Sequence, residues 1–549
     1  MAQLIIECLC EELPYGMIEP ALQALNKGCR ELLRGIEIGA SRMYSTPRRL
    51  TVVIDDVAPG SAAVEKIVTG PPLAAAKRDG EWTKGAVGFA RGKGLTVDDL
   101  FVVEAKGRQV IAARVTSGGD KSMDRISAGL AKLVEGLPFK KSMRWGTGAY
   151  KWGRPLTQVC AVLGQERIPA VVMGKQTVDT SLGHRRSPKG AFKVASEAGY
   201  LSDLRERWVE PDRAVRMQRI QDNLTEIADS RGLQVSWDKR LLEEVTDLVE
   251  WPVGLSAEFD AMLLELPGRL LIESMRVHQR YFPTTREGVL TNTFLVVSNN
   301  PTGDAALIAD GNRRVLAARF HDASFFLAED RKTPLAQIGA GLSKMRWVRG
   351  LGTMAEKQTR LASLGQKLAP LFGAELAEVA QAGSLCKADL LSQMVGEFTE
   401  LQGHMGRLYA QGEGMSPAVA LAIEEHYFPR YSGDALPSGS TGAALALADR
   451  LDTLMGCFSI GLAPKGSADP QGLRRAAIGV NAILAEKGPA DLSWKALLGL
   501  ASQGRELDPE LLDKLQDFLK ARYRAALIGE GFGTDMVDAV LAGKGIEPG

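Results

Sequence analysis

The stretch Gln3-Leu-Ile-Ile-Glu-Cys-Leu9 and the later stretch Leu50-Thr-Val-Val-Ile-Asp-Asp-Val57 decide how the fold begins. Both are short, rich in aliphatic residues and bounded by turn signals, which predicts two strands. Between them, after the break at Leu13-Pro14, residues 17–33 have the apolar spacing of a helix. The first 57 residues therefore predict a β-α-β opening.

The remaining sequence divides into three parts. The mixed pattern continues to residue 190, with a hairpin expected at 101–115 around Lys106-Gly107 and a helix at 122–133. Residues 191–335 begin as a charged helical segment and continue as strands and helices. Residues 336–549 are dominated by helix formers, with breaks at Gly373 and around 429–437 and 464–470. We expect an α+β fold, in which a mixed α/β body (1–190) is completed by 191–335 and followed by a helical domain (336–549).

The composition is that of an ordinary globular protein of two to four domains. Of the 549 residues, 45% are hydrophobic and 24% charged, and 67 Lys and Arg residues nearly balance 66 Asp and Glu residues. Overall charge therefore says nothing about nucleic acid, because binding of a polyanion depends on where the cations lie. A basic surface has to be found locally.

The cysteines and the N-terminus indicate the compartment. The six cysteines include no Cys-x-x-Cys pair, which argues against a disulfide framework or a zinc site. Acidic residues at 7, 11 and 12 interrupt the first apolar run, which argues against a signal peptide, and no run approaches the roughly 20 apolar residues of a membrane span. We expect a cytoplasmic protein that does not enter a membrane.

The sequence offers no self-contained active site. Gly118-Gly119-Asp120-Lys121-Ser122 and Gly92-Lys93-Gly94 lack the spacing of a phosphate-binding loop and are interpreted as turns. Residues 140–144 superficially resemble the mobile lysine loop of class I synthetases, but their order is wrong and no partner histidine motif precedes them. The five histidines form no HExxH-type pair. A nucleotide-activating enzyme or zinc hydrolase is therefore disfavoured.

Many unusual strings occur in one order along nearly the whole chain. They are Glu11-Glu12-Leu13-Pro14, Thr46-Pro47-Arg48-Arg49-Leu50, Met143-Arg144-Trp145-Gly146, Arg154-Pro155, Gly183-His184-Arg185, Leu242-Glu243-Glu244-Val245, Val249-Glu250-Trp251-Pro252, Gln279-Arg280-Tyr281-Phe282-Pro283, the run from Gly311 to Phe326, Glu329-Asp330-Arg331-Lys332, Tyr427-Phe428-Pro429-Arg430-Tyr431, the run from Ala448 to Leu454, and the run from Asp469 to Ala477. In this order they resemble the β subunit of the bacterial two-subunit glycyl-tRNA synthetase.

The resemblance implies a division of labour between two chains. It implies an α2β2 class II ligase in which the α subunit activates glycine with ATP and Mg²⁺. The β chain would bind tRNA(Gly) and no cofactor of its own. The family normally continues into a helical anticodon-binding domain, whereas this sequence stops at residues 545–549, which resemble the preceding linker. The resemblance therefore implies that the anticodon reader is missing.

Arginines in the matching strings are the candidate tRNA contacts. They are Arg48, Arg49, Arg185, Arg313, Arg314 and Arg319. Arg48 and Arg49 follow a proline and are suited to hold phosphate bidentately, with salt bridges to nearby carboxylates as the alternative. Residues 311–350 carry eight basic residues against three acidic ones, a bias that fits tRNA, an acidic partner surface or a solvated helical face.

The helical domain resembles the HD superfamily of metal-dependent phosphohydrolases. The resemblance places the remnants of its metal ligands at Asp389 and Asp449, with alanine where the paired histidine would stand. Two carboxylates without imidazoles hold a divalent metal poorly, so we expect a metal-free site kept for helix packing. The alternatives to a tRNA-binding subunit are an HD-type nucleotide phosphohydrolase and a tRNA-binding chaperone that works alone.

Weak, salt-sensitive tRNA binding is expected of such a chain. Without an anticodon reader it would contact the acceptor arm or elbow through phosphates, and phosphate contacts weaken as salt rises. Replacing Arg48 and Arg49 with alanine is expected to lower affinity for glycine tRNA and unrelated tRNAs alike.

Overall fold

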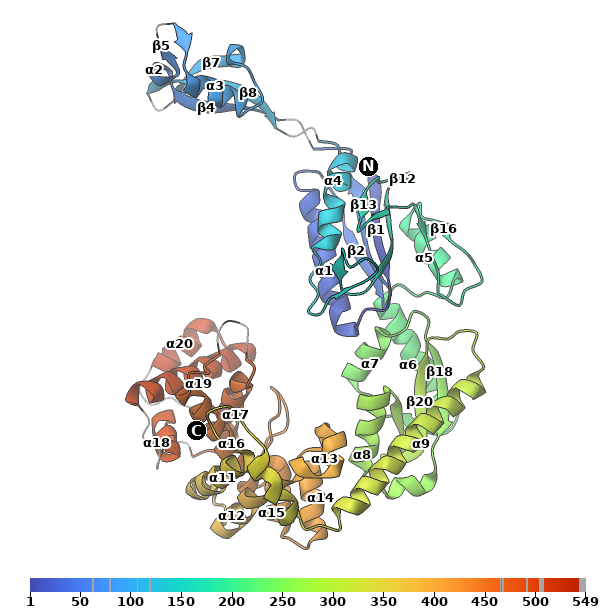
Figure 1. The fold of residues 1–549 in the computed structure, drawn as a ribbon, viewed down its shortest axis with the longest axis vertical. Helices are drawn as coiled ribbons and strands as arrows, with labels where there is room; N and C mark the ends of the chain where they lie inside the picture. The colour runs from blue at the N-terminus through green and yellow to red at the C-terminus, as the bar shows by residue number, and fades with distance from the viewer. Residues whose placement is uncertain are drawn as a thin grey trace. The chain divides into compact units, whose positions relative to one another are not determined.

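The computed structural model describes residues 1–61, 64–78, 80–105, 107–117, 120–464, 466, 469–489, 492–502 and 508–542. The chain divides into two compact units. Unit 1 comprises residues 1–264 and 275–316, and unit 2 comprises 265–274 and 317–549. Figure 1 shows the mixed α/β character of the first and the helical character of the second. The predicted α+β class is confirmed.

A five-stranded antiparallel sheet forms the first part of unit 1. Its strand order is β12-β11-β1-β3-β2. The strands are β1 (Ala2–Cys10), β2 (Ser41–Thr46), β3 (Arg49–Val57), β11 (Leu156–Leu163) and β12 (Glu166–Arg167). The helices α1 (Tyr15–Leu32) and α4 (Ser122–Glu135) lie side by side on one face, and α5 (Glu197–Glu206) covers the other (Figure 1).

Strand alternation explains why β1 contributes to both cores. Leu4, Ile6 and Cys8 pack toward α1 and α4, whereas Ile5 packs toward α5, because successive side chains of a strand point to opposite faces. Glu7 lies on the α5 side with Ile5. The predicted opening is found as β1, α1 and β3, with the short strand β2 as an addition that the sequence analysis does not predict.

The segment 64–117, which we call the insert lobe, is inserted between β3 and α4. Its sheet has the order β4-β8-β7, formed by β4 (Val64–Pro72), β7 (Leu100–Ala105) and β8 (Arg108–Ser117). The helices α2 (Leu73–Ala76) and α3 (Lys84–Arg91) and the short strands β5 (Lys77–Arg78) and β6 (Glu81–Trp82) complete it. β7 and β8 are the predicted hairpin. Of the proposed phosphate-loop turns, Gly118 and Gly119 lie outside the described residues.

Three short two-stranded ladders lie between α4 and α5. They consist of β9 (Met143–Arg144) with β10 (Lys151–Trp152), β13 (Val171–Val172) with β14 (Lys175–Gln176), and β15 (Thr180–Ser181) with β16 (Phe192–Lys193). Each lies outside the five-stranded sheet.

A second sheet with its own core completes unit 1. Its order is β17-β19-β20-β18, from β17 (Gln234–Val235), β18 (Val253–Glu258), β19 (Phe282–Arg286) and β20 (Val289–Ser298). The helices α6 (Arg213–Asp229) and α7 (Lys239–Thr246) share its core. The helix α9 (Ala305–Asp330) follows and crosses the boundary between the units.

Unit 2 is helical. It contains α8 (Gly268–Glu273), α10 (Leu335–Gly339), α11 (Met354–Leu368), α12 (Leu376–Leu385), α13 (Gln393–Glu397), α14 (His404–Gly412), α15 (Pro417–Glu425), α16 (Ser440–Ser459), α17 (Leu473–Lys487), α18 (Trp494–Ser502), α19 (Pro509–Gly529) and α20 (Thr534–Ala542). Nearly all residues of α16 are buried. The predicted breaks fall at Gly373, which adopts a φ of 63° after a short 3-10 turn, and on either side of α16.

No described helix is long and apolar enough to cross a membrane. Residues 545–549, interpreted as a linker, lie outside the described residues.

Candidate nucleic-acid interface

Arg48 and Arg49 lie in a buried ion-pair network. Arg49 has no exposed surface, and its Nη1 donates to Glu7 Oε2 at 2.7 Å while its Nε lies 3.5 Å from Glu250 Oε1. Arg48 is 8% exposed, with its Nη1 3.5 Å from Glu250 Oε2. The structure therefore shows the salt bridges stated as the alternative to phosphate binding, and a guanidinium as deeply buried as that of Arg49 does not reach a phosphate.

The side chains of Glu7, Arg48, Arg49, Tyr200 and Glu250, which we call the buried ion-pair network, form one connected set of ion pairs and hydrogen bonds. Glu7 also accepts hydrogen bonds from Tyr200 Oη at 2.6 Å and from Ser181. Burial opposes ionisation of Glu250, but Arg49 and Arg48 outweigh it and hold the pKa of Glu250 below its usual value. Burial and the neighbouring Glu7 raise the pKa of Tyr200 well above its usual value. The network joins segments from distant strings and leaves no cation unmatched.

Arg185 belongs to the rim of the same cluster. It forms ion pairs with Glu11 and with Glu12, the latter at 3.3 Å, and Glu12 lies 3.9 Å from Arg48 Nε. Burial lowers the pKa of the neighbouring His184, which hydrogen-bonds with Asn299. The strings around residues 11, 48, 184 and 250 thus meet in space and neutralise one another.

The other candidate arginines lie on α9. Arg313 and Arg314 share Asp310 on α9, at 2.6 and 2.9 Å, and remain 46% and 65% exposed in their side chains. Arg319 lies 3.5 Å from Glu397 in unit 2 and stacks over Phe398. Arg48 and Arg49 are buried, so the six candidates do not all lie on an exposed surface, whereas Arg313 and Arg314 leave one excess positive charge in solvent.

Asp389 and Asp449 are held by protein groups. Asp389 is fully buried, and its Oδ2 accepts hydrogen bonds from the backbone N–H groups of Gly403 and Gly406 at 2.5 and 3.0 Å. Burial is the main reason that its pKa is raised to about 6. These bonds satisfy two backbone N–H groups at the start of α14 that have no partner within the helix, which gives Asp389 a structural role.

Two ammonium groups surround Asp449. Lys357 Nζ lies 2.7 Å from one oxygen and Lys387 Nζ 3.1 Å from the other. Burial raises the pKa of Asp449, but Lys357 and Lys387 overcome this and lower it well below the usual value. Two adjacent cations repel a divalent metal. Among the described residues, no group of three or more His, Cys, Asp or Glu side chains is placed to hold one.

The segment around the string Met143-Arg144-Trp145-Gly146 has a strong local charge bias. Residues 136–165 contain five basic residues and no acidic one. Lys140, Lys141, Arg144 and Lys151 are exposed and, within the described parts of the chain, form no ion pair. We call residues 140–154 the basic hairpin. A local count of missing acids would have found it.

The strand pairing brings like charges together. β9 pairs with β10 so that Arg144 lies directly opposite Lys151. Like charges in directly opposite positions destabilise a ladder, and an anion between them relieves the repulsion. Tyr150, which directly precedes Lys151, is also exposed, and an aromatic ring near exposed cations is typical of nucleic-acid sites.

Packing holds the basic hairpin in place. Trp152 is 1% exposed, donates from Nε1 to the carbonyl of Val134 at 2.9 Å and meets Phe139 edge to face at 4.8 Å. Gly153 lies so close to Phe139 that an added Cβ would be 2.6 Å from the ring. Gly146 and Gly148 form the turn with positive φ, which glycine adopts without steric cost. The exposed cations therefore stand on a rigid base.

Comparisons with known proteins agree with the order of the strings. A family model described as glycyl-tRNA synthetase beta subunit matches residues 4–542. The glycine–tRNA ligase beta subunit of Desulforamulus reducens is 38% identical over 98% of this chain and 79% of its own length. That of Chromohalobacter salexigens is 38% identical with the same coverage, and that of Syntrophotalea carbinolica is 38% identical over all of this chain and 81% of its own length.

These matches extend over both units and include every string from Glu11 to Ala477. Neither the family nor these relatives support the phosphohydrolase alternative. The chain belongs to the glycyl-tRNA synthetase beta subunit family.

Proposed function

We propose that this chain holds tRNA(Gly) for a separate catalytic subunit of a glycine–tRNA ligase, in an α2β2 assembly. The family and its relatives support a beta subunit of this ligase. The partner subunit would bind glycine, ATP and Mg²⁺, and this chain would contribute to catalysis by positioning the other substrate. Such positioning converts an encounter of two large molecules into a reaction within one complex.

The basic hairpin is the observation that carries tRNA binding. Its four exposed cations lack carboxylate partners in the described structure, unlike the arginines of the buried ion-pair network. Phosphates are the counterions that RNA supplies, and release of condensed ions makes such contacts favourable at low salt. We propose that Arg144 and Lys151 share one phosphate of the tRNA backbone. Arg313 and Arg314 are further candidates because their single partner, Asp310, neutralises only one of them.

Reconstitution with a partner subunit tests the division of labour. The pure chain is expected to give no glycine-dependent ATP–pyrophosphate exchange, and exchange is expected when a glycine-activating α subunit is added. The two chains should co-purify. Exchange by the pure chain would contradict the proposal, as would failure of the mixture to aminoacylate tRNA(Gly) when the α subunit itself is folded.

Direct binding tests the tRNA role. The isolated chain should retain tRNA(Gly) on a filter at low salt and release it as salt rises, because phosphate contacts dominate. Binding that is absent at low salt, or that does not change with salt, would contradict the proposal.

A further inference from the structure

The sheet of the insert lobe has one covered face and one uncovered face. β7 and β8 pair so that Leu100 faces Ala113, while Phe101 faces Ala112. Leu100, Ile111 and Ala113 form the lobe's core with α2 and α3. Because neighbouring strand residues point to opposite faces, Phe101 lies on the side that these helices do not cover.

The uncovered face carries an aromatic ring, a cation and aliphatic groups. Ile67 on β4 pairs with Arg114 on β8, which places both on the same face as Phe101. The Arg114 guanidinium lies 5.7 Å from the centre of the Phe101 ring, and Ile67 is 58% exposed. None of the three belongs to the lobe's hydrophobic core. A partly buried aromatic ring beside a guanidinium, outside the hydrophobic core, is a surface on which a nucleobase stacks.

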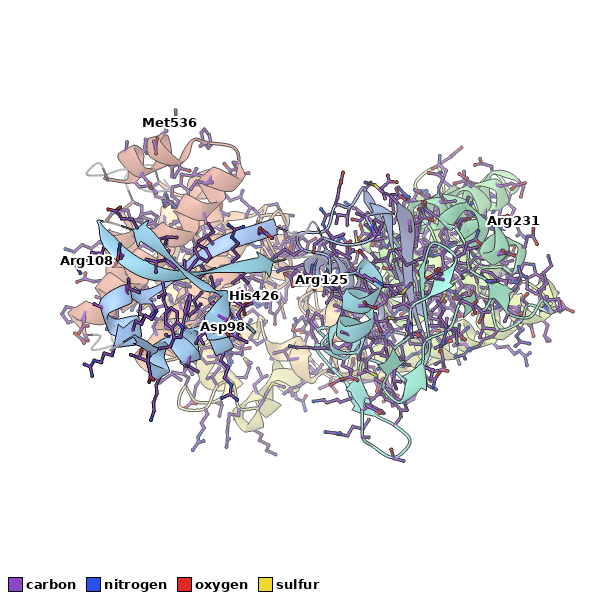
Figure 2. The ribbon with its side chains drawn as sticks, turned by 90° about the horizontal axis from the view of Figure 1, so that it is seen from above. Asp98, Arg108, Arg125, Arg231, His426 and Met536 are labelled. Atoms are coloured by element: carbon purple, nitrogen blue, oxygen red, sulfur yellow. The ribbon has the colours of Figure 1, made fainter. Side chains whose placement is uncertain are left out.

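The insert lobe carries basic residues without carboxylate partners. The eight described cations of the lobe are Lys66, Lys77, Arg78, Lys84, Arg91, Lys93, Arg108 and Arg114. Within the described ranges none forms an ion pair, although five acidic residues are present in the same described part of the lobe. Figure 2 shows Arg108 at an end of the lobe's sheet and Asp98 elsewhere in the lobe. The described part of the lobe therefore has eight basic residues against five acidic ones, and its cations form no ion pair there.

The connections of the lobe indicate a module. Gly60 and Lys121 form an isolated antiparallel bridge, and the Ser122 backbone N–H donates to the carbonyl of Pro59 at 2.9 Å. The two ends of the insertion are thus joined at its base. Its core is also separate from that of the body. The lobe is an addition to the body with a face of its own.

We propose that the uncovered face of the insert lobe binds a single-stranded segment of RNA, with a base stacked on Phe101 and Arg114 against its backbone or ring. This deepens the proposed function, since the RNA would be an unpaired segment of the bound tRNA. Charge decides between RNA and a protein partner, because the unmatched cations match a polyanion. Duplex RNA buries its base faces in its own stack and offers none to Phe101.

Anisotropy titrations of the full chain test this site. The probes are a labelled, unstructured 12-nucleotide RNA and a blunt 12-base-pair RNA duplex. Phe101→Ala and Phe101→Leu should raise the Kd for the single strand about tenfold, since stacking on one ring contributes about 1.4 kcal/mol or more. Phe101→Tyr should retain binding because it keeps the ring. The Kd for the duplex should not change.

Val102→Ala is the matched control for Phe101→Ala, because Val102 is 44% exposed and points to the opposite face of the same strand. Lys66→Gln is the control for Arg114→Gln, because Lys66 pairs with Val115 on the covered side. Each control should weaken binding less than its counterpart. Equal effects of Phe101→Ala and Val102→Ala, or full binding by Phe101→Leu, would overturn the proposal.

The two proposals fail in different ways. If the wild-type chain binds tRNA but the Phe101 variants bind the single strand normally, the stacking site is wrong and the tRNA role stands. If the chain binds the single strand through Phe101 but does not bind tRNA, the tRNA role is wrong and the stacking site stands.

Discussion

Arginine plays opposite roles in the buried ion-pair network and in the basic hairpin. In the network, Arg49 is fully buried between Glu7 and Glu250, and its charge is neutralised by the protein. In the hairpin, Arg144 lies opposite Lys151 in solvent, with no acidic residue between positions 136 and 165. The contrast shows that an arginine's role is set by the carboxylates that fold against it. Residue type and position in a motif do not settle the matter.

The largest effect should come from breaking the network. Arg49→Met leaves Glu7 and Glu250 buried without a full counter-charge, which costs about 3–5 kcal/mol. Urea denaturation, monitored by circular dichroism, should show a large decrease in the free energy of unfolding for the transition that involves unit 1. A loss of tRNA affinity in an Arg48 and Arg49 double variant would then follow from unfolding, and a fully folded variant with weaker tRNA binding would contradict this interpretation.

Replacing Asp389 tests whether its buried carboxylate has a structural role. Asp389→Ala removes the acceptor of two buried backbone N–H groups and should destabilise unit 2 by about 1–3 kcal/mol. Ser392→Ala is a nearby control that leaves these two bonds intact. Metal titration of the folded wild-type chain should give no stoichiometric binding, and a metal that bridges Asp389 and Asp449 would contradict the structural role.

The contribution of Asp389 to the stability of the folded chain should change with pH in a definite direction. Its pKa is about 6 in the folded chain against a usual value of 3.8, so the folded state binds the proton more tightly. Its contribution to stability is therefore greatest below about pH 4 and falls as pH rises to about 6, by up to about 3 kcal/mol. The amide of the variant Asp389→Asn does not titrate. Relative to wild type, this variant should become more stable between about pH 4.5 and about pH 7, and a constant difference would contradict the assignment.

The smallest effect is expected at an exposed pair. Arg314→Met removes a partner of Asp310 that is 65% exposed, and exposed ion pairs on a helix contribute little because water and salt screen them. Its melting temperature should stay within error of wild type. A clear drop would mean that exposure does not separate structural from functional arginines in this chain.

Local sequence patterns predicted the elements well. The strand expected at 3–9 is β1, the helix expected at 122–133 is α4, and the break expected at Gly373 is found. The short strand β2 was missed because six residues beside an edge give little periodic signal. The proposed domain boundaries stay predictions, although the two compact units divide within α9 at residue 316.

The site was harder to predict than the fold. Arg48 and Arg49 follow a proline as a phosphate clamp would, but their partners Glu7 and Glu250 are remote in sequence and are brought together only by the folded chain. The reverse holds for the basic hairpin, where the decisive feature is the absence of any nearby acid. Uncovered faces such as that of Phe101 depend on strand register and helix placement, which sequence patterns do not give.

One measurement tests the central claim, that cations without carboxylate partners hold tRNA. The variant Lys140→Gln, Lys141→Gln, Arg144→Gln and Lys151→Gln is compared with a control of equal charge change. The control replaces Lys189, Arg231, Lys332 and Lys514, each of which has a carboxylate partner. Kd for tRNA(Gly) is measured across a series of salt concentrations.

The hairpin variant should bind tRNA(Gly) more weakly than wild type, and its log Kd should depend less steeply on log salt, by about one unit for each phosphate that it no longer binds. The control should keep nearly the affinity and slope of wild type. Equal losses of affinity in the two variants, or a hairpin variant that binds like wild type, would contradict the claim.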